Sequence, residues 1–259
     1  MSRYNHRISE RKWKSHWSYP PETNRHYLTA IVPSASDGLS LENARLLIFA
    51  DFYRRLHQEN IPSLHSTAVD ETLIQQALDL GVHLHTEPAL EYEFCVASRD
   101  YLHLVEIEAV GDLLACGRFL TDGPVSDFLP DYGADALRLF FLFQGPPHRD
   151  YCLNLQALGG AYGFVQRLWR MAFDTAEGSH VVSVDSQIIE TLRRDVHLRI
   201  QANKPHTALA AVMGFVKQHP VLPRDLMSQI MILMEPYTPF LSAEILDLLS
   251  TSWNAFDLE

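Results

Sequence analysis

The chain has 259 residues, of which 47% are hydrophobic, and this is enough for a buried core and for two domains. No segment approaches about 18 uninterrupted apolar residues, so the sequence predicts no membrane span. The three cysteines, Cys95, Cys116 and Cys152, are odd in number and far apart. This spacing excludes a disulfide framework and favours free thiols in a reducing, cytoplasmic compartment.

The net charge of −11 is unevenly distributed along the chain. Residues 1–26 carry a net charge of +4, whereas residues 27–134 carry −12. A protein that grips phosphate backbones usually presents a basic stripe. The acidic first half therefore argues against tight, unaided binding of nucleic acid.

The first half of the chain alternates between strand-like and helix-like segments. In chain order these are a strand at 26–32, a helix at 39–60, a strand at 61–68, a helix at 71–81 that ends at Gly81, and extended or ambiguous runs at 91–98 and 101–110. Glycine at a helix end suits a left-handed cap. Alternation of this kind predicts a parallel, doubly wound α/β sheet.

Beyond about residue 135 the apolar pattern is helical almost throughout, and prolines such as Pro205 and Pro236 separate the segments. Ile8, Trp13 and Trp17 also lie at roughly helical spacing, which predicts a helix near the N-terminus. We therefore expect a Rossmann-like core over residues 1–135 and an α-helical bundle over residues 136–259.

Several segments then resemble one known family. They are "ISERKWKSHW" (8–17), "DYGADALRLFFLFQGPPHRD" (131–150), "GGAYGFVQRLWRM" (159–171), "NKPHTALAAVMGFVK" (203–217) and "MILMEPYTPFLSAEILDLL" (231–249). In content and order they are similar to class I aminoacyl-tRNA synthetases, and most of all to leucyl-tRNA synthetases. The resemblance implies the family's parallel-sheet core and its helical anticodon-binding-like bundle. The family's large editing insertion does not fit between Asp70 and Asp131.

The resemblance also implies where nucleotide chemistry would take place. The family's HIGH signature falls on Ser40, Leu41, Glu42 and Asn43, so both histidines are replaced and a glutamate replaces the glycine that lets ATP approach. The KMSKS signature should fall within 113–130, where the chain has no lysine and Arg118 is the only basic residue. Without these groups the developing charge of adenylate formation lacks its stabilisation. We therefore expect no ATP cofactor.

The predicted substrate-binding residues are Asp37, Ser40, Asn43, Arg45 and Asp70. Arg45 retains the basic residue of the signature, and Asp70 matches the aspartate that receives the substrate's amino group in the family. A carboxylate facing an ammonium group forms a charge-assisted pair. Asp70 is equally well explained as the cap of the helix that follows it.

Two serines are the candidate catalytic residues. Ser34 and Ser36 follow the first strand, in a loop where the related cyclodipeptide synthases place a serine that accepts an aminoacyl group. Such a nucleophile needs a nearby acid or base. The alternative is that both serines satisfy amides of the loop.

Two further groups of residues invite a functional interpretation. Arg193, Arg194 and Arg199 could contact tRNA, although a solvated amphipathic helix explains them equally well. His83, His85 and Glu87 alternate as metal ligands can, but the sequence shows no fourth ligand, so we predict no metal site.

Three functions are compatible with these observations. In the preferred one, the protein takes aminoacyl-tRNA, such as leucyl-tRNA, and transfers the aminoacyl group to a small amine or a second aminoacyl group. In the second, it still adenylates an amino acid for a carrier protein or a metabolite. In the third, it is a non-catalytic relative that binds tRNA, a protein or an aminoacyl ligand.

Overall fold

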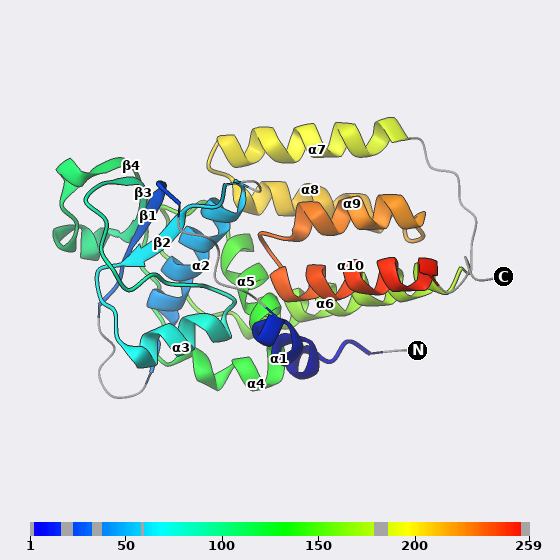
Figure 1. Cartoon of the computed structure of the whole chain (residues 1–259), viewed down its shortest axis with the longest axis horizontal. Coiled ribbons are helices and arrows are strands. Elements are labelled where there is room, and N and C mark those ends of the chain that lie inside the picture. Colours follow the sequence, from blue (N-terminus) through cyan, green and yellow to red (C-terminus); the bar gives the residue numbers. More distant parts are fainter. Residues whose placement is uncertain (1–2, 17–22, 33–37, 58–59, 179–185, 255–259) are drawn as a thin grey trace.

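The computed structural model describes residues 3–16, 23–32, 38–57, 60–178 and 186–254 (Figure 1). Its centre is a four-stranded parallel sheet with the order β2-β1-β3-β4. The strands are β1 (His26–Ala30), β2 (Ser63–Ser66), β3 (Tyr92–Ser98) and β4 (Val110–Cys116). This order confirms the predicted Rossmann-like core.

Two helices connect the first three strands. They are α2 (Leu41–Arg55), which returns from β1 to β2, and α3 (Glu71–Asp79), which leads from β2 to β3. Nearly every residue of α2 is buried. Gly81 has a φ of 78°, which confirms the left-handed conformation predicted after this second helix.

The connection from β3 to β4 differs from the prediction. Residues 101–110 were expected to be extended or ambiguous, but 3₁₀ helices η1 (Arg99–Leu104) and η2 (Ile107–Ala109) occupy most of this run. The last strand begins only at Val110 and includes residues that the sequence did not assign to a strand. Tyr101 and Leu102 pack against a small cluster under the sheet, which accounts for the apolar residues of the run.

The second half of the chain is helical, as predicted. Its helices are α4 (Leu129–Tyr132), α5 (Ala134–Phe143), α6 (Leu155–Ala176), α7 (Ser186–Gln201), α8 (Pro205–Gln218), α9 (Arg224–Met234) and α10 (Pro239–Asn254). In Figure 1 the longer helices lie roughly parallel to one another beside the sheet domain. The N-terminal helix α1 (His6–His16) is also confirmed, and its Trp13 donates a hydrogen bond of 2.6 Å to Glu244 of α10. Among the described helices, none combines the length and the apolar character needed to cross a membrane.

A buried cluster of charges joins the two halves. The Asp51 carboxylate in the middle of α2 is fully buried and forms ion pairs with Arg54 (2.7 Å), Arg55 (2.7 Å) and, from α5, Arg138 (2.8 Å). These guanidinium groups outweigh the burial and hold the pKa of Asp51 well below its usual range. Arg138 also donates to the carbonyl oxygen of Pro236, beyond α9. Helix α5 begins at the predicted domain boundary and links α2 to the bundle.

Candidate functional site

The carboxyl edge of the sheet is the expected location of a ligand. The chain leaves β1 towards β2 on one side and leaves β3 towards β4 on the other. Sheets of this type bind ligands at such a switch point, outside the carboxyl ends of the strands. Helix α2 begins at this edge, so its first turn faces the candidate site.

Two of the predicted binding residues have local structural partners. The Ser40 hydroxyl caps α2 and accepts a hydrogen bond of 3.2 Å from the backbone of Asn43. The Asn43 side chain is buried and donates to the carbonyl oxygen of Val32 over 2.7 Å. Both residues therefore fix the junction between β1 and α2, and any contact with a substrate would be additional.

Glu42 places a carboxyl group in the first turn of the same helix. Burial raises its pKa, while Ser98 at the end of β3 and the cation of Arg45 act to lower it. Burial, followed by the negative charges of Glu42 and Asp100, raises the pKa of the neighbouring Tyr101 to about 12. The helix N-terminus where a phosphate would bind therefore already holds the carboxyl group of Glu42.

Arg45 does not point freely into the site. Its guanidinium group is buried and donates to the carbonyl oxygens of Gly117 (2.7 Å) and Pro147 (2.9 Å). The same group lies over the rings of Phe49 (5.4 Å) and Tyr151 (5.5 Å). These contacts join α2 to the loops that follow β4 and α5 and explain the arginine without a substrate.

Two arginines at this edge share one carboxylate. Asp150 contacts Arg118 (3.1 Å) and Arg99 (2.5 Å), and it also accepts from the backbone N–H of Arg118 (2.8 Å). The bonds from Arg118, followed by those from Arg99, lower the pKa of Asp150 to about 2. The sequence singled out Arg118 but missed Arg99 and Asp150, because no periodic signal links three residues that are so far apart in the chain.

Comparison with known proteins supports a relationship along part of the chain. No family profile matches it. The leucine–tRNA ligase of Rhodopirellula baltica is 34% identical over 128 residues, which cover 44% of this chain and 14% of the relative. That of Nitratidesulfovibrio vulgaris (strain DP4) is 30% identical over 199 residues, which cover 60% of this chain and 24% of the relative.

The fold agrees with these sequence relatives. The LeuRS of Agrobacterium radiobacter K84 agnB2, solved in a ternary complex with tRNA and LeuAMS, superimposes with a TM-score of 0.51 at 12% identity. The match covers 61% of this chain and 27% of that structure. This chain is a class I aminoacyl-tRNA synthetase-like protein. It aligns with about a quarter or less of the length of these curated relatives.

Of the other residues predicted for the substrate site and for catalysis, the structure describes Asp70 but not Ser34, Ser36 or Asp37. Asp70 is exposed and caps α3, where its carboxylate accepts a hydrogen bond of 2.7 Å from the backbone of Leu73. The capping alternative is therefore realised, and its pairing with an amino group stays a prediction. Ser34, Ser36 and Asp37 lie outside the described residues.

The arginines predicted to contact tRNA lie on α7. Arg193 pairs with Glu190 (3.3 Å) and Arg199 with Asp195 (2.9 Å), both along the same helix. Arg194 is exposed. Pairs at this spacing are typical of a solvated helix face, so the tRNA contacts stay a prediction.

The sequence "HLHTE" forms a loop after α3 rather than a strand. Burial, followed by the cation of Arg54, lowers the pKa of His83 to about 4, so its ring is neutral at physiological pH. His85 packs near the ring of His65 at a centroid distance of 5.6 Å. Within the described residues, no group of three or more His, Cys, Asp or Glu side chains is arranged to hold a metal ion.

Proposed function

We propose that this synthetase-like protein does not activate an amino acid with ATP and instead uses aminoacyl-tRNA, such as leucyl-tRNA, as the donor in an aminoacyl transfer. The observation that carries the proposal is the carboxyl group of Glu42 in the first turn of α2. A triphosphate approaching this helix would meet a negative charge where the family has glycine. An aminoacyl ester brings no triphosphate to this position.

The cations at the same edge support this proposal. Arg45 is bonded to two carbonyl oxygens, and both Arg99 and Arg118 contact Asp150. Stabilising a leaving pyrophosphate requires positive groups already oriented towards it. These three arginines are oriented towards groups of the protein itself.

The proposed transfer needs no ATP because the aminoacyl ester of tRNA is already activated. The amine of the acceptor attacks the ester carbonyl, a C–N bond forms, and the C–O bond to the terminal ribose breaks. The proton released by the amine goes to the ribose oxygen, which leaves as a hydroxyl group. Ser34 or Ser36 could carry the aminoacyl group between two such steps as a serine ester.

A second candidate function is non-catalytic binding of tRNA or an aminoacyl ligand. The capping roles of Ser40 and Asp70 favour it, because both residues have structural partners without a substrate. This candidate predicts binding of leucyl-tRNA without turnover. The third candidate, adenylation for a carrier protein or a metabolite, predicts pyrophosphate exchange.

The deciding experiment is amino-acid-dependent ATP–pyrophosphate exchange with all twenty amino acids, with a complete leucyl-tRNA synthetase as the positive control. We expect no exchange above background, and exchange would overturn the proposal. Labelled leucyl-tRNA is then offered with a panel of small amines. Amide product that disappears in Ser34→Ala or Ser36→Ala supports the transfer, whereas salt-sensitive binding without product supports the non-catalytic candidate.

A further inference from the structure

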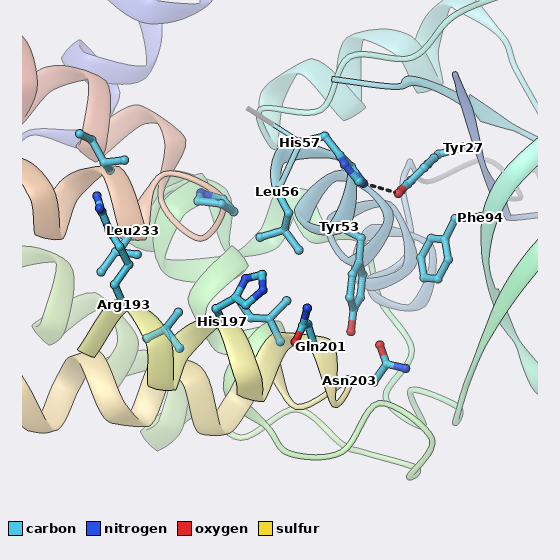
Figure 2. Close-up of a pocket in the computed structure, with 14 residues that line it drawn as sticks. Tyr27, Tyr53, Leu56, His57, Phe94, Arg193, His197, Gln201, Asn203 and Leu233 are labelled. Carbon is cyan, nitrogen blue, oxygen red and sulfur yellow. Dashed lines mark hydrogen bonds between the residues drawn. The ribbon is translucent and has the colours of Figure 1, made fainter. Parts of the chain in front are cut away.

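A cavity lies at the opposite end of α2 from Glu42. It has a volume of about 490 Å³ and separates the sheet from helices α7 and α9 (Figure 2). Its walls come from β1, β3, the last turn of α2, α7, the turn after α7, and α9 with the residues that follow it. The volume lies within the usual range of small-molecule sites, roughly 300–1,000 Å³. Of the residues predicted to bind substrate, Ser40, Asn43, Arg45 and Asp70 are described by the structure, and none of these four lines this cavity.

The wall on the sheet side is aromatic. The ring of Phe94 lies 5.3 Å from that of Tyr27 and 5.1 Å from that of Tyr53, measured between centroids. Both pairs are tilted rather than stacked face to face. Rings arranged in this way present apolar faces and edges to a planar group placed beside them.

This wall also carries two hydroxyl groups. The hydroxyl of Tyr27 is hydrogen-bonded to Nε2 of His57 over 2.7 Å, whereas that of Tyr53 is buried and has no hydrogen-bond partner among the described residues. Figure 2 shows the Tyr53 hydroxyl directed towards the end of the cavity where Asn203 lies. Burial raises the pKa of Tyr53, so the group remains a donor. An unpaired buried donor costs free energy, which an acceptor on a ligand would recover.

The wall formed by α7 supplies polar groups and positive charge. Its lining residues are spaced along one face of the helix: Arg193, Val196, His197, Ile200 and Gln201. Among the described residues that line the cavity there is no Asp or Glu, although the protein has a net charge of −11. Glu190, outside the cavity, contacts Arg193 at 3.3 Å, and the Arg193 side chain remains 45% exposed. This distribution of charge favours an anionic ligand over a cationic one.

We propose that this cavity binds a small aromatic acid. The aromatic ring lies against Tyr27, Phe94 and Tyr53, and the acid group faces His197 on α7, with the positive charge of Arg193 one helical turn away. An acceptor on the ligand pairs with the hydroxyl of Tyr53. The site is separate from the carboxyl edge, and the proposal does not depend on the aminoacyl transfer.

The probe for this proposal is 8-anilinonaphthalene-1-sulfonate, an aromatic anion whose fluorescence rises on binding. Its control is N-phenyl-1-naphthylamine, which has the same rings without the charge. We expect saturable binding at one site by the folded protein, with the anion bound more tightly than the neutral compound. Thermal unfolding is recorded for every variant, because partly folded proteins also bind this dye.

Three variants connect the binding to this cavity. Ile200→Trp fills it and should weaken binding of the anion at least about tenfold. Arg193→Gln, at an exposed position, should weaken the anion about three- to tenfold and leave the neutral compound unchanged. Tyr53→Phe keeps the ring and should weaken binding about threefold, the effect of one lost hydrogen bond.

The matched control lies in another cavity. A groove of about 520 Å³ between α5, α6 and α8 is also apolar and also has cations, Arg167 and Lys217, among its lining residues. Gly160 lines this groove, and a Cβ added there meets nothing within 4 Å, so Gly160→Leu places a side chain in the groove from a position where its Cβ is accommodated. We expect this variant to bind the dye as the wild type does.

Two outcomes would overturn the proposal. One is binding that survives both Ile200→Trp and Arg193→Gln, and the other is binding abolished by Gly160→Leu. Equal affinity for the charged and the neutral probe would remove the anionic part of the proposal. If Ile200→Trp fails to fold, Arg193→Gln still decides the result, because its side chain is exposed.

Discussion

The two ends of helix α2 face different kinds of surroundings. At its first turn, beside the carboxyl edge of the sheet, Asn43 and Arg45 are bonded to backbone carbonyl groups. At its last turn, a cavity of about 490 Å³ opens beside Tyr53 and His57, and the hydroxyl of Tyr53 has no partner among the described residues. At the end predicted from the sequence to bind a substrate, the Arg45 guanidinium group is bonded to the protein itself, although buried Oε1 of Glu42 and Oδ1 of Asn43 have no hydrogen-bond partner among the described residues. The opposite end offers a cavity.

This difference shows that the resemblance of a segment to a family does not establish that the segment still binds the family's ligand. A resemblance between sequences marks where relatives bind nucleotide, because the aligned residues keep their place in the fold. It does not report how those residues are now bonded. Arg45 shows the distinction, since the sequence predicts that it binds substrate while its guanidinium group joins two loops. The comparison between the two ends of α2 requires that buried ion pairs and hydrogen bonds hold this helix in place. The following predictions measure how much those bonds contribute to stability.

The largest effect is expected in the middle of α2. Asp51→Asn removes a buried carboxylate and leaves Arg54, Arg55 and Arg138 without their shared counter-charge. The expected loss in the free energy of unfolding is about 3–5 kcal/mol, measured by urea denaturation. The control Asp79→Asn breaks the partly exposed pair with Lys14 and should cost at most about 1 kcal/mol. Equal losses for the two variants would mean that the buried cluster does not anchor the helix.

A smaller effect is expected at the carboxyl edge. Arg45→Met leaves the carbonyl oxygen of Gly117 without its guanidinium donor and that of Pro147 with only the backbone N–H of Gly117, at a cost of about 2–3 kcal/mol in the free energy of unfolding. Arg118→Met, at the exposed neighbour, should leave the urea midpoint near that of the wild type. An Arg45→Met protein as stable as the wild type would show that the arginine is available for a ligand, and the comparison between the two ends would fail.

The general fold could be predicted from local patterns, and its exceptions have local causes. Strands alternating with amphipathic helices give a parallel sheet, as observed. Strand β4 was missed because Gly111 and Asp112 interrupt its apolar residues, which do not alternate with polar ones as in a half-buried strand. Residues 101–110 were expected to be extended or ambiguous because their apolar residues resemble a strand.

The site was harder to predict because its bonds join distant parts of the chain. Arg45 lies 72 residues before Gly117 and 102 before Pro147, and no pattern in the sequence indicates that these carbonyl groups converge on it. The pairing of Arg99 with Asp150 has the same cause. The capping role of Asp70, in contrast, depends on the three residues that follow it and could be foreseen as one of two alternatives.

The junction of α1, α5 and α10 tests whether anchoring is confined to α2. Burial is the largest cause that raises the pKa of Glu10 to about 8 and that of Asp135 to about 7. Both carboxyl groups therefore bind protons more tightly in the folded state, so stability falls as the pH rises from about 4.5 to 8. Glu10→Gln cannot ionise and should gain about 3 kcal/mol relative to the wild type between pH 5 and pH 8.

The measurement for this prediction is the urea midpoint of both proteins at each pH. A difference between the two proteins is needed because other groups titrate in the opposite sense. The pKa of His65 is lowered to about 4, chiefly by burial, and its protonation destabilises the fold as the pH falls below about 6.5. A difference that does not change with pH would show that Glu10 ionises normally in the folded protein.

The smallest effect separates the two interpretations of Asp70. Asp70→Ala removes the cap of α3 and should cost about 1 kcal/mol in the free energy of unfolding, whereas Asp70→Asn keeps a capping oxygen and should cost only a few tenths. Asparagine carries no charge, so it cannot form an ion pair with the ammonium group of an aminoacyl ligand. The asparagine variant therefore keeps the structural role and removes the proposed functional one. If it is as stable as the wild type but binds leucyl-tRNA or transfers its aminoacyl group less well, the carboxyl edge still receives a substrate. If binding and transfer are unchanged, Asp70 is a helix cap alone, and the contrast between the two ends of α2 becomes sharper.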